Sequence, residues 1–305
     1  MAEGSTGDGA PALHETAEKA LDRLVSELRP QLHRFCARMT GSVIDGEDVV
    51  QEALLKAIEA LPRTGPLTNP EGWLFRIAHN AALDFLRRRA RHEAAHSDED
   101  PDMVAAPANP VHDRQVAAAS LRTFMRLPVA QRCTVILKDV VGYSLQEVCD
   151  VMGGSIPAVK AALQRGRTRL RELAEEPDDI MPPVLAGPER ARLMNYVDRF
   201  NARDFDAIRN MLADDVRLDL VNRLRAKGRS EVGQYFHRYS LSSDWQCVPG
   251  FVDRRPAILM FDPQDLAGRP WYFIVLDWTN DSVVGIRDFR FARYALEGAE
   301  LITQG

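Results

Sequence analysis

The spacing of hydrophobic positions changes along this chain. Up to about residue 175, apolar side chains recur every three or four residues, which is the period of an amphipathic helix. From about residue 214 onward, short apolar runs separated by turn-forming residues replace that pattern. Strands are expected over residues 214–221, 245–252, 256–262, 269–280 and 281–296. Helices followed by successive strands predict all-α domains and then an α+β domain with a curved antiparallel sheet.

The first two helices are expected over residues 13–39 and 45–61. The first carries one continuous apolar side, with a break or kink expected at Pro30. Asp45 can cap the second helix, and the acidic residues that follow it suit the positive end of the helix dipole.

A third helix is expected over residues 69–92. Asn69 followed by Pro70 is a good cap and first position for a helix. Its inward stripe is predicted at i, i+4 and i+8, on Trp73, Ile77 and Ala81. A run of four arginines makes its end strongly basic: Arg87, Arg88, Arg89 and Arg91.

The stretch from Tyr143 to Leu173 predicts two helices joined by a tight turn. Gly153 and Gly154 stop the first helix, and Ser155 is placed to cap the second. Two apolar stripes mark the buried sides: Leu145, Val148 and Met152, then Val159, Leu163 and Leu170. The second helix is otherwise basic, as in a helix-turn-helix whose second helix enters a DNA major groove. The alternative is an ordinary helical hairpin with a solvated basic face.

Composition shifts separate these segments. Residues 1–12 are expected to be a disordered tail, and residues 94–112 and 176–188 are acidic, proline-rich linkers. The domains are therefore predicted over residues 13–93, 113–175 and 189–305.

The overall composition is that of a globular protein, with 45% hydrophobic and 27% charged residues and a net charge of −5. DNA binding would therefore depend on local basic patches. The four cysteines are scattered without a paired spacing, which argues against a zinc site or a disulfide framework and suits a reducing cytoplasm. No signal peptide or membrane-spanning run is recognised, so a cytoplasmic protein without membrane contact is expected.

The helical segments resemble an extracytoplasmic-function (ECF) sigma factor. Residues 45–61 are similar to the region 2 helix that docks on RNA polymerase, and residues 69–89 to the region that melts and reads the −10 element. Residues 127–170 resemble region 4, which reads the −35 element. The resemblance implies two partners, core RNA polymerase and promoter DNA, and no cofactor or metal.

Site residues follow from this resemblance. The polymerase-binding face is expected on Asp48, Gln51, Glu52 and Leu55, which otherwise read as a solvated helix face. The −10 contacts are expected from Arg76, His79, Asn80, Arg87 and Arg88, with the loop 63–68 as a candidate base pocket. Trp73 could stack on a base, but its partner at i+4, Ile77, favours a core position.

The recognition helix offers a third set of candidates. Gln164 and Arg165 suit base edges, while Lys160, Arg167 and Arg169 suit phosphates. The full −35 set is Ser155, Ala158, Lys160, Gln164, Arg165, Arg167 and Arg169. The acidic stretch 97–102 either imitates nucleic-acid charge in the polymerase or is a plain tether.

The C-terminal part resembles a SnoaL-like domain of the nuclear-transport-factor-like cone fold, through residues 196–218 and 227–236. The resemblance implies a pocket that could take a small-molecule ligand, with candidate lining residues Tyr235, His237, Trp245, Trp271, Asp277 and Trp278. Asp277 and His237 are acid/base types, but without a spaced motif they suit structural roles, and no enzyme activity is predicted.

The leading hypothesis is an initiation factor that recognises two promoter elements and is regulated by its own third domain. One alternative is a helix-turn-helix regulator that does not act as a sigma subunit. Such a regulator would not need the segment 45–91. The other alternative is a cone-fold enzyme fused to a DNA-binding module.

Overall fold

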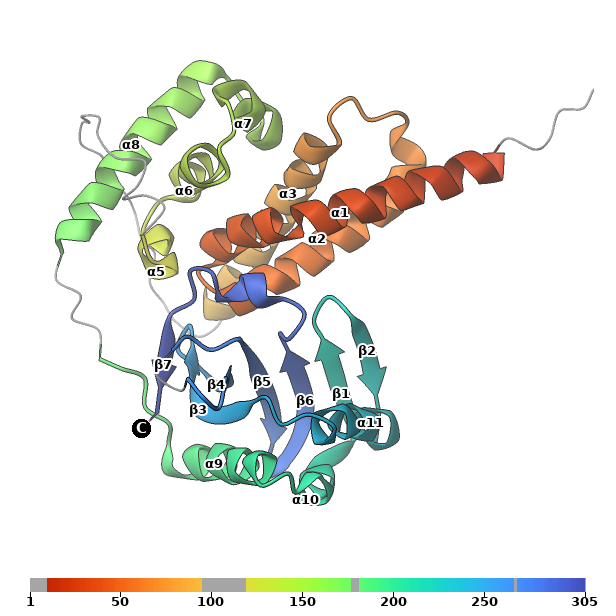
Figure 1. Cartoon of the computed structure of the whole chain (residues 1–305). Helices are drawn as coiled ribbons and strands as arrows, with labels where there is room; N and C mark the ends of the chain where they lie inside the picture. Colours follow the sequence, from red (N-terminus) through yellow and green to blue (C-terminus); the bar gives the residue numbers. More distant parts are fainter. Residues whose placement is uncertain (1–9, 95–118, 177–180, 266–267, 305) are drawn as a thin grey trace, which may run out of the picture. The chain divides into compact units, whose positions relative to one another are not determined.

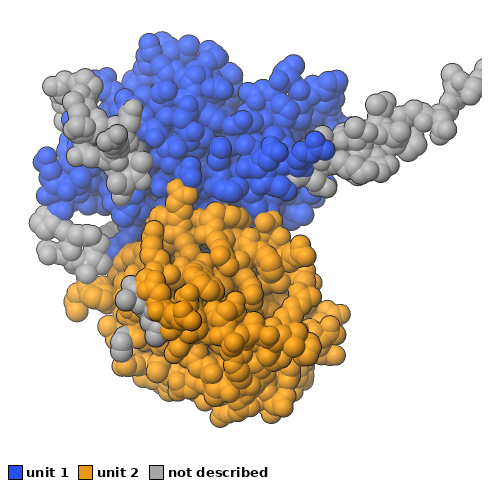
Figure 2. Space-filling model, viewed as in Figure 1, with its two compact units in different colours: residues 1–177 blue, residues 178–305 orange. Residues whose placement is uncertain are grey.

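The structure, a computed structural model, describes residues 10–94, 119–176, 181–265 and 268–304. The chain forms two compact units, the N-terminal unit 1–177 and the C-terminal unit 178–305, which Figure 2 shows in blue and orange. Most of the acidic linker expected at 94–112, and the expected tail up to residue 9, lie outside the described residues. None of the described helices combines the length and the apolar character that crossing a bilayer requires.

Three long helices form the first part of the N-terminal unit, which we call the N-terminal module: α1 (Ala10–Thr40), α2 (Val43–Thr64) and α3 (Pro70–Ala94) (Figure 1). α1 continues through Pro30, so the break expected there does not occur. Leu28, Leu32 and Phe35 lie on both sides of the proline and are all buried, so packing keeps the helix in one piece.

The helix α2 begins two residues before the position expected from Asp45. The Ser42 side chain accepts hydrogen bonds from the backbone N–H groups of Ile44 and Asp45, at 3.2 and 3.4 Å. Ser42 is therefore the cap, and Asp45 is buried inside the first turn. Pro62 lies within the last turn, and the helix ends at Thr64.

The helix α3 begins where the sequence predicts. Asn69 Oδ1 accepts a hydrogen bond from the Gly72 backbone N–H at 2.9 Å. The inward stripe is displaced from the prediction, because Trp73 and Ile77 are half-buried and only Ala81 lies fully inside. The buried side chains of α3 are Leu74, Phe75, Ala78, Ala81 and Ala82.

The rest of the N-terminal unit, the helix-turn-helix module, contains α5 (Leu121–Met125), α6 (Val129–Val135), the π-helix η1 (Ile136–Val141), α7 (Leu145–Met152) and α8 (Ile156–Glu175). Ser144 and Glu147 form a reciprocal capping box at the start of α7. Gly153 ends α7 with a positive φ of 71°, and the Ser155 side chain caps α8 by accepting from Ala158 N at 3.4 Å. The predicted helix-turn-helix geometry is present.

The C-terminal unit opens with two helices, α9 (Gly187–Asn201) and α10 (Phe205–Asn210), and contains a third, α11 (Arg229–Ser240). The strands are β1 (Leu212–Leu220), β2 (Leu224–Lys227), β3 (Gln246–Val252), β4 (Arg255–Phe261), β5 (Tyr272–Thr279), β6 (Ser282–Asp288) and β7 (Leu301–Thr303). Figure 1 shows α9, α10 and α11 along one side of the sheet.

The sheet has the order β2-β1-β6-β5-β4-β3-β7 and differs from the prediction in two ways. The β1–β6 pair is parallel, so the sheet is mixed and not wholly antiparallel. The last strand, expected to continue to residue 296, ends at Asp288, and a short 3-10 helix, η2 (Arg293–Leu296), follows it. The short edge strands β2 and β7 were not predicted.

Candidate functional site

The outer face of α8 is a solvent-accessible polar surface. Val159, Leu163 and Leu170 are buried as predicted, and this fixes which side of the helix faces outward. Five of the candidate −35 residues are exposed: Ser155, Ala158, Lys160, Gln164 and Arg165. They cover the first half of the helix, the part that enters a major groove in helix-turn-helix proteins.

The other two −35 candidates are held by acids of the same unit. Arg167 forms a two-pronged ion pair with Asp139 of η1, at 2.8 and 2.5 Å, and the Asp139 side chain is only 1% exposed. Arg169 lies 3.0 Å from Glu172 on the next turn. The Arg167 guanidinium therefore ties α8 to η1, which leaves less of it available to a phosphate than the Lys160 ammonium.

The candidate polymerase face lies on α2. Asp48 and Leu55 are exposed, while Gln51 and Glu52 are half-buried. Leu55 is 58% exposed, and Ile58, one turn further on, is 57% exposed. Leu55 and Ile58, at i and i+3, therefore form a small exposed apolar pair on α2. Ile58 was missed in the sequence because its spacing also fits a core stripe.

The candidate −10 residues lie on α3, and most of them face solvent. Arg76, Asn80, Arg87 and Arg88 are exposed. Arg88 also reaches α2, where its Nη2 lies 2.6 Å from Glu52 Oε2, and this bond lowers the pKa of the Glu52 carboxyl. The structure thus joins a candidate polymerase residue to a candidate DNA residue.

His79 does not share this exposure. It is 6% exposed, and its Nδ1 lies 3.3 Å from the Cys133 Sγ on α6. Burial lowers the pKa of the His79 imidazole to about 4, so the ring is neutral at pH 7. In this arrangement a nucleic acid could not reach it.

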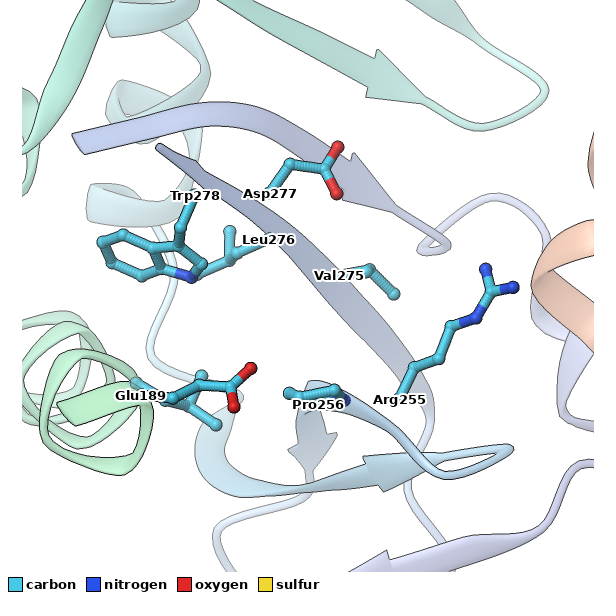
Figure 3. A pocket seen from close by; sticks show the side chains of 8 residues that line it. Glu189, Arg255, Pro256, Val275, Leu276, Asp277 and Trp278 are labelled. Atoms are coloured by element: carbon cyan, nitrogen blue, oxygen red, sulfur yellow. The ribbon is translucent and has the colours of Figure 1, made fainter. Parts of the chain in front are cut away.

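The C-terminal unit contains a surface pocket of about 170 Å³ (Figure 3). The β4–β5 ladder stops at Ile258 and Ile274, although β5 continues to Thr279. Pro256 lacks the N–H that would continue the ladder, which leaves an opening between the strands. The pocket at this opening is lined by Glu189, Leu193, Arg255, Pro256, Val275, Leu276, Asp277 and Trp278.

Only two of the six predicted pocket residues, Asp277 and Trp278, line that pocket. His237 is exposed on α11, and Trp271 is half-buried against the core. Trp245 is buried, with its ring centroid 5.1 Å from that of Phe200. These three positions depend on how α9 and α11 pack on the sheet, which the spacing of aromatic residues does not reveal.

Tyr235 belongs instead to a buried polar network that the sequence did not reveal. Asp288, which is fully buried, accepts hydrogen bonds from the hydroxyls of Tyr235 at 2.8 Å and Tyr239 at 2.7 Å. Tyr239 also pairs with the Tyr272 hydroxyl at 3.1 Å. Burial raises the pKa of Asp288, although these bonds oppose the shift. The side chains of this network bond to one another and come from both α11 and the sheet, so the network holds α11 against the sheet.

Among the residues that the structure describes, no group of three His, Cys, Asp or Glu side chains is placed to hold a metal ion. The four cysteines are free thiols and are all buried.

Two family models match the N-terminal unit. Sigma-70 region 2 matches residues 24–92, and Sigma-70 region 4 matches residues 121–170. The ECF sigma factor SigM of Mycobacterium tuberculosis is 33% identical over 167 residues, which cover 53% of this chain and 81% of SigM. The chain belongs to the ECF RNA polymerase sigma factor family.

Other ECF sigma factors match a smaller share of their own length. SigE of Mycolicibacterium smegmatis is 33% identical over 172 residues, which cover 55% of this chain and 64% of SigE. For SigG of M. tuberculosis the match covers 55% of the relative. The chain therefore spans less than two thirds of the length of these relatives.

Two solved structures complete the comparison. The crystal structure of the ECF sigma factor SigJ of M. tuberculosis aligns with 88% of this chain and 98% of SigJ, at 19% identity and a TM-score of 0.35. An NTF2-like protein of Cytophaga hutchinsonii aligns with 32% of the chain and 95% of its own length, at 16% identity and a TM-score of 0.25.

Within this sigma factor, the region 2 match contains every candidate polymerase and −10 residue. The region 4 match contains every candidate −35 residue, from Ser155 to Arg169. The two matches coincide with the two modules of the N-terminal unit, and the C-terminal unit lies beyond them.

Proposed function

We propose that this sigma factor binds core RNA polymerase and directs initiation at promoters that it recognises through two elements. The single observation that supports this most is the exposed polar face of α8, presented by a capped helix directly after a glycine turn. The other part of the proposal is attachment to the polymerase. It is supported by family membership and by the exposed apolar pair on α2.

At the −35 element, α8 would lie in the major groove. Gln164 can form a bidentate contact with adenine and Arg165 with guanine, whereas Lys160 can neutralise a phosphate. The pairing of Arg167 with Asp139 gives that arginine a positioning role, since it fixes α8 against η1.

At the −10 element, α3 would hold the unpaired strand. Arg76 and Arg87 are exposed cations for phosphates, and Asn80 lies between them on the same polar face. On α2, Leu55 and Ile58 would be buried by the polymerase, with Asp48 and Gln51 providing directional polar contacts at the same face.

We infer a regulatory role for the C-terminal unit. The pocket at the β4–β5 opening, with the carboxylates of Glu189 and Asp277 and the Trp278 indole, is the place where a small ligand would bind. Binding there would shift the protein between more and less active forms, because a ligand favours whichever form it binds more tightly.

Run-off transcription with purified core polymerase tests the proposal. On a promoter selected with the wild-type protein, Arg165→Ala is expected to reduce output about tenfold, in keeping with ~1–3 kcal/mol for one lost base contact. Arg190→Ala, a matched exposed arginine on α9, is expected to leave output unchanged. Absence of any promoter-dependent transcript would reject the sigma function in favour of a regulator that acts without polymerase.

Truncation after residue 177 tests the regulatory part in the same assay. A changed output, in either direction, is the expected result. Equal output from the truncated and full-length proteins would reject a regulatory role for the C-terminal unit and leave the promoter function intact.

A further inference from the structure

The pocket at the β4–β5 opening contains the carboxylate of Glu189. This residue lies in the first turn of α9 and is half-buried, so part of its hydration is lost. Within the part of the chain that the structure describes, its side chain makes no hydrogen bond or ion pair. A carboxylate that is partly removed from water binds most strongly to a cation that can also donate a hydrogen bond to it.

The other charged side chains of this pocket point away from Glu189 (Figure 3). Asp277 lies opposite Gly285 of β6, and a Cβ on that glycine would be 2.5 Å from Asp277 Oδ2. The Asp277 carboxylate therefore lies over β6. The Arg255 guanidinium extends towards the other end of the pocket. Glu189 is thus the charge that a ligand would meet on the α9 side.

The Trp278 indole is held in place beside the pocket. The Arg192 guanidinium lies over the ring, 6.0 Å from its centroid, and donates to the Asn280 carbonyl at 2.9 Å. Tyr196 packs against the same indole at 86°, with the ring centroids 6.3 Å apart. Figure 3 shows the indole nitrogen on the side of the ring that faces Leu276. An N–H held in this position can donate to an acceptor on a ligand, because the indole nitrogen is a donor only.

The remaining walls of the pocket are apolar and limit the size of a ligand. They are formed by Leu193, Pro256, Val275 and Leu276. The volume of about 170 Å³ has room for roughly six non-hydrogen atoms, at ~30 Å³ each as in liquid water. A short branched hydrocarbon chain with polar groups at one end fits this space.

We propose that the pocket binds a small protonated amine that carries a neighbouring hydrogen-bond acceptor, as an amino alcohol does. The ammonium group bonds to Glu189, the acceptor takes the Trp278 N–H, and the apolar chain packs on Leu193, Pro256 and Leu276. This inference rests on the ligand role proposed above for the C-terminal unit, and it names the class of ligand.

An NMR titration of the full-length protein with L-valinol at constant ionic strength tests the site. The indole N–H signal of Trp278, assigned with Trp278→Phe, is expected to shift and to saturate. Isoamyl alcohol, which is L-valinol without its amino group, is expected to bind at least about tenfold more weakly, because it lacks the charged donor. Isovalerate has a carboxylate on the same carbon chain and should bind no better than the alcohol. A preference for isovalerate, or no saturable shift with L-valinol, would overturn the proposal.

Glu189→Gln provides the matched substitution, because it keeps the shape of the side chain and removes its charge. The variant is expected to lose the preference for L-valinol over isoamyl alcohol. Asp198→Asn makes the same change at an exposed position of α9 and should keep the preference. Glu189 also suits the positive end of the α9 dipole, so thermal unfolding checks that both variants are folded. An unchanged preference in folded Glu189→Gln would contradict the site, and the ligand series on the wild type gives its answer without any variant.

Run-off transcription separates this inference from the proposed function. L-valinol is expected to change the output of the full-length protein and not that of the protein truncated after residue 177. Saturable binding without any change in output would support the amine site and reject the regulatory role. An effect of truncation without any binding of L-valinol would reject the amine site alone.

Discussion

At the scale of single residues, burial decides what a side chain can do. His79 and Arg76 both lie on α3, but the first is covered by Cys133 and the second is exposed. The covered imidazole is neutral at pH 7, since charging it inside the fold would require a bare cation in an apolar site. Its protonation is therefore linked to the stability of the N-terminal unit.

The direction of this linkage follows from the pKa of His79, which burial lowers from 6.5 to about 4. Between pH 6.5 and about pH 4 the unfolded chain binds a proton that the folded chain does not. His79 is therefore expected not to lower the free energy of unfolding above pH 6.5. As the pH falls from 6.5 towards 4, this residue should lower the free energy of unfolding by at most about 1.4 kcal/mol per pH unit.

Urea unfolding of the wild type and His79→Gln between pH 7 and pH 4 measures this effect. The variant should have a shallower dependence on pH over that range. A proton NMR titration of His79 with a midpoint near 6.5 would contradict the lowered pKa.

At the scale of elements, α1 and α2 cross closely at Gly46. A Cβ at Gly46 would lie 2.6 Å from the backbone N and Cα of Ala37, a distance that real side chains do not show. Backbone atoms cannot rotate away as a side chain can, so the crossing needs glycine for its space alone. The first turn of α2 is consequently buried, and its outer turns are left to carry Leu55 and Ile58.

Gly46→Ala is therefore expected to destabilise the N-terminal unit by about 1–3 kcal/mol, the usual cost of overpacking. Gly187→Ala, at the start of α9, has nothing within 4 Å of the added Cβ and is the matched control. Thermal unfolding measures both. Equal midpoints for Gly46→Ala and wild type would contradict this prediction, because they would show that the two helices can move apart to admit the added methyl group without loss of stability.

At the scale of the whole molecule, the residues that the structure describes form two hydrophobic clusters that lie in different units. One joins α1 through α8, and the other joins α9 through α11 to the sheet. Phe200 illustrates the second, since its ring lies 5.0 to 5.4 Å from those of Tyr239, Trp245 and Phe205. Separate cores predict separate unfolding transitions.

Phe200→Ala should accordingly destabilise the C-terminal unit by about 3–5 kcal/mol and leave the N-terminal unit unchanged. Hydrogen exchange followed by mass spectrometry is the measurement, with faster exchange expected in peptides from residues 187–304 only. Phe35→Ala is the mirror variant and should affect only the N-terminal unit. Coupled loss of protection in both units would refute independent cores.

Local signals in the sequence identified most helices and their ends. Ser155, Gly153 and the apolar stripe of α8 act within a few residues of one another, so they can be read without the fold. The cap of α2 was missed because Ser42 and Asp45 are both good caps, and only packing of the first turn decides between them. The roles of the candidate DNA and polymerase residues come from the family resemblance and stay predictions.

The sequence by itself determined most of the helices, the change from helices to strands, the helix-turn-helix and the family, because these depend on residues close together along the chain. Only the tertiary structure decided the parallel β1–β6 pair, the burial of Asp288 beneath two tyrosines and the contact between Cys133 and His79. Cys133 and His79 are 54 residues apart, and no periodicity links positions at that distance. Such contacts arise when whole elements pack, and that depends on the free energy of the complete core.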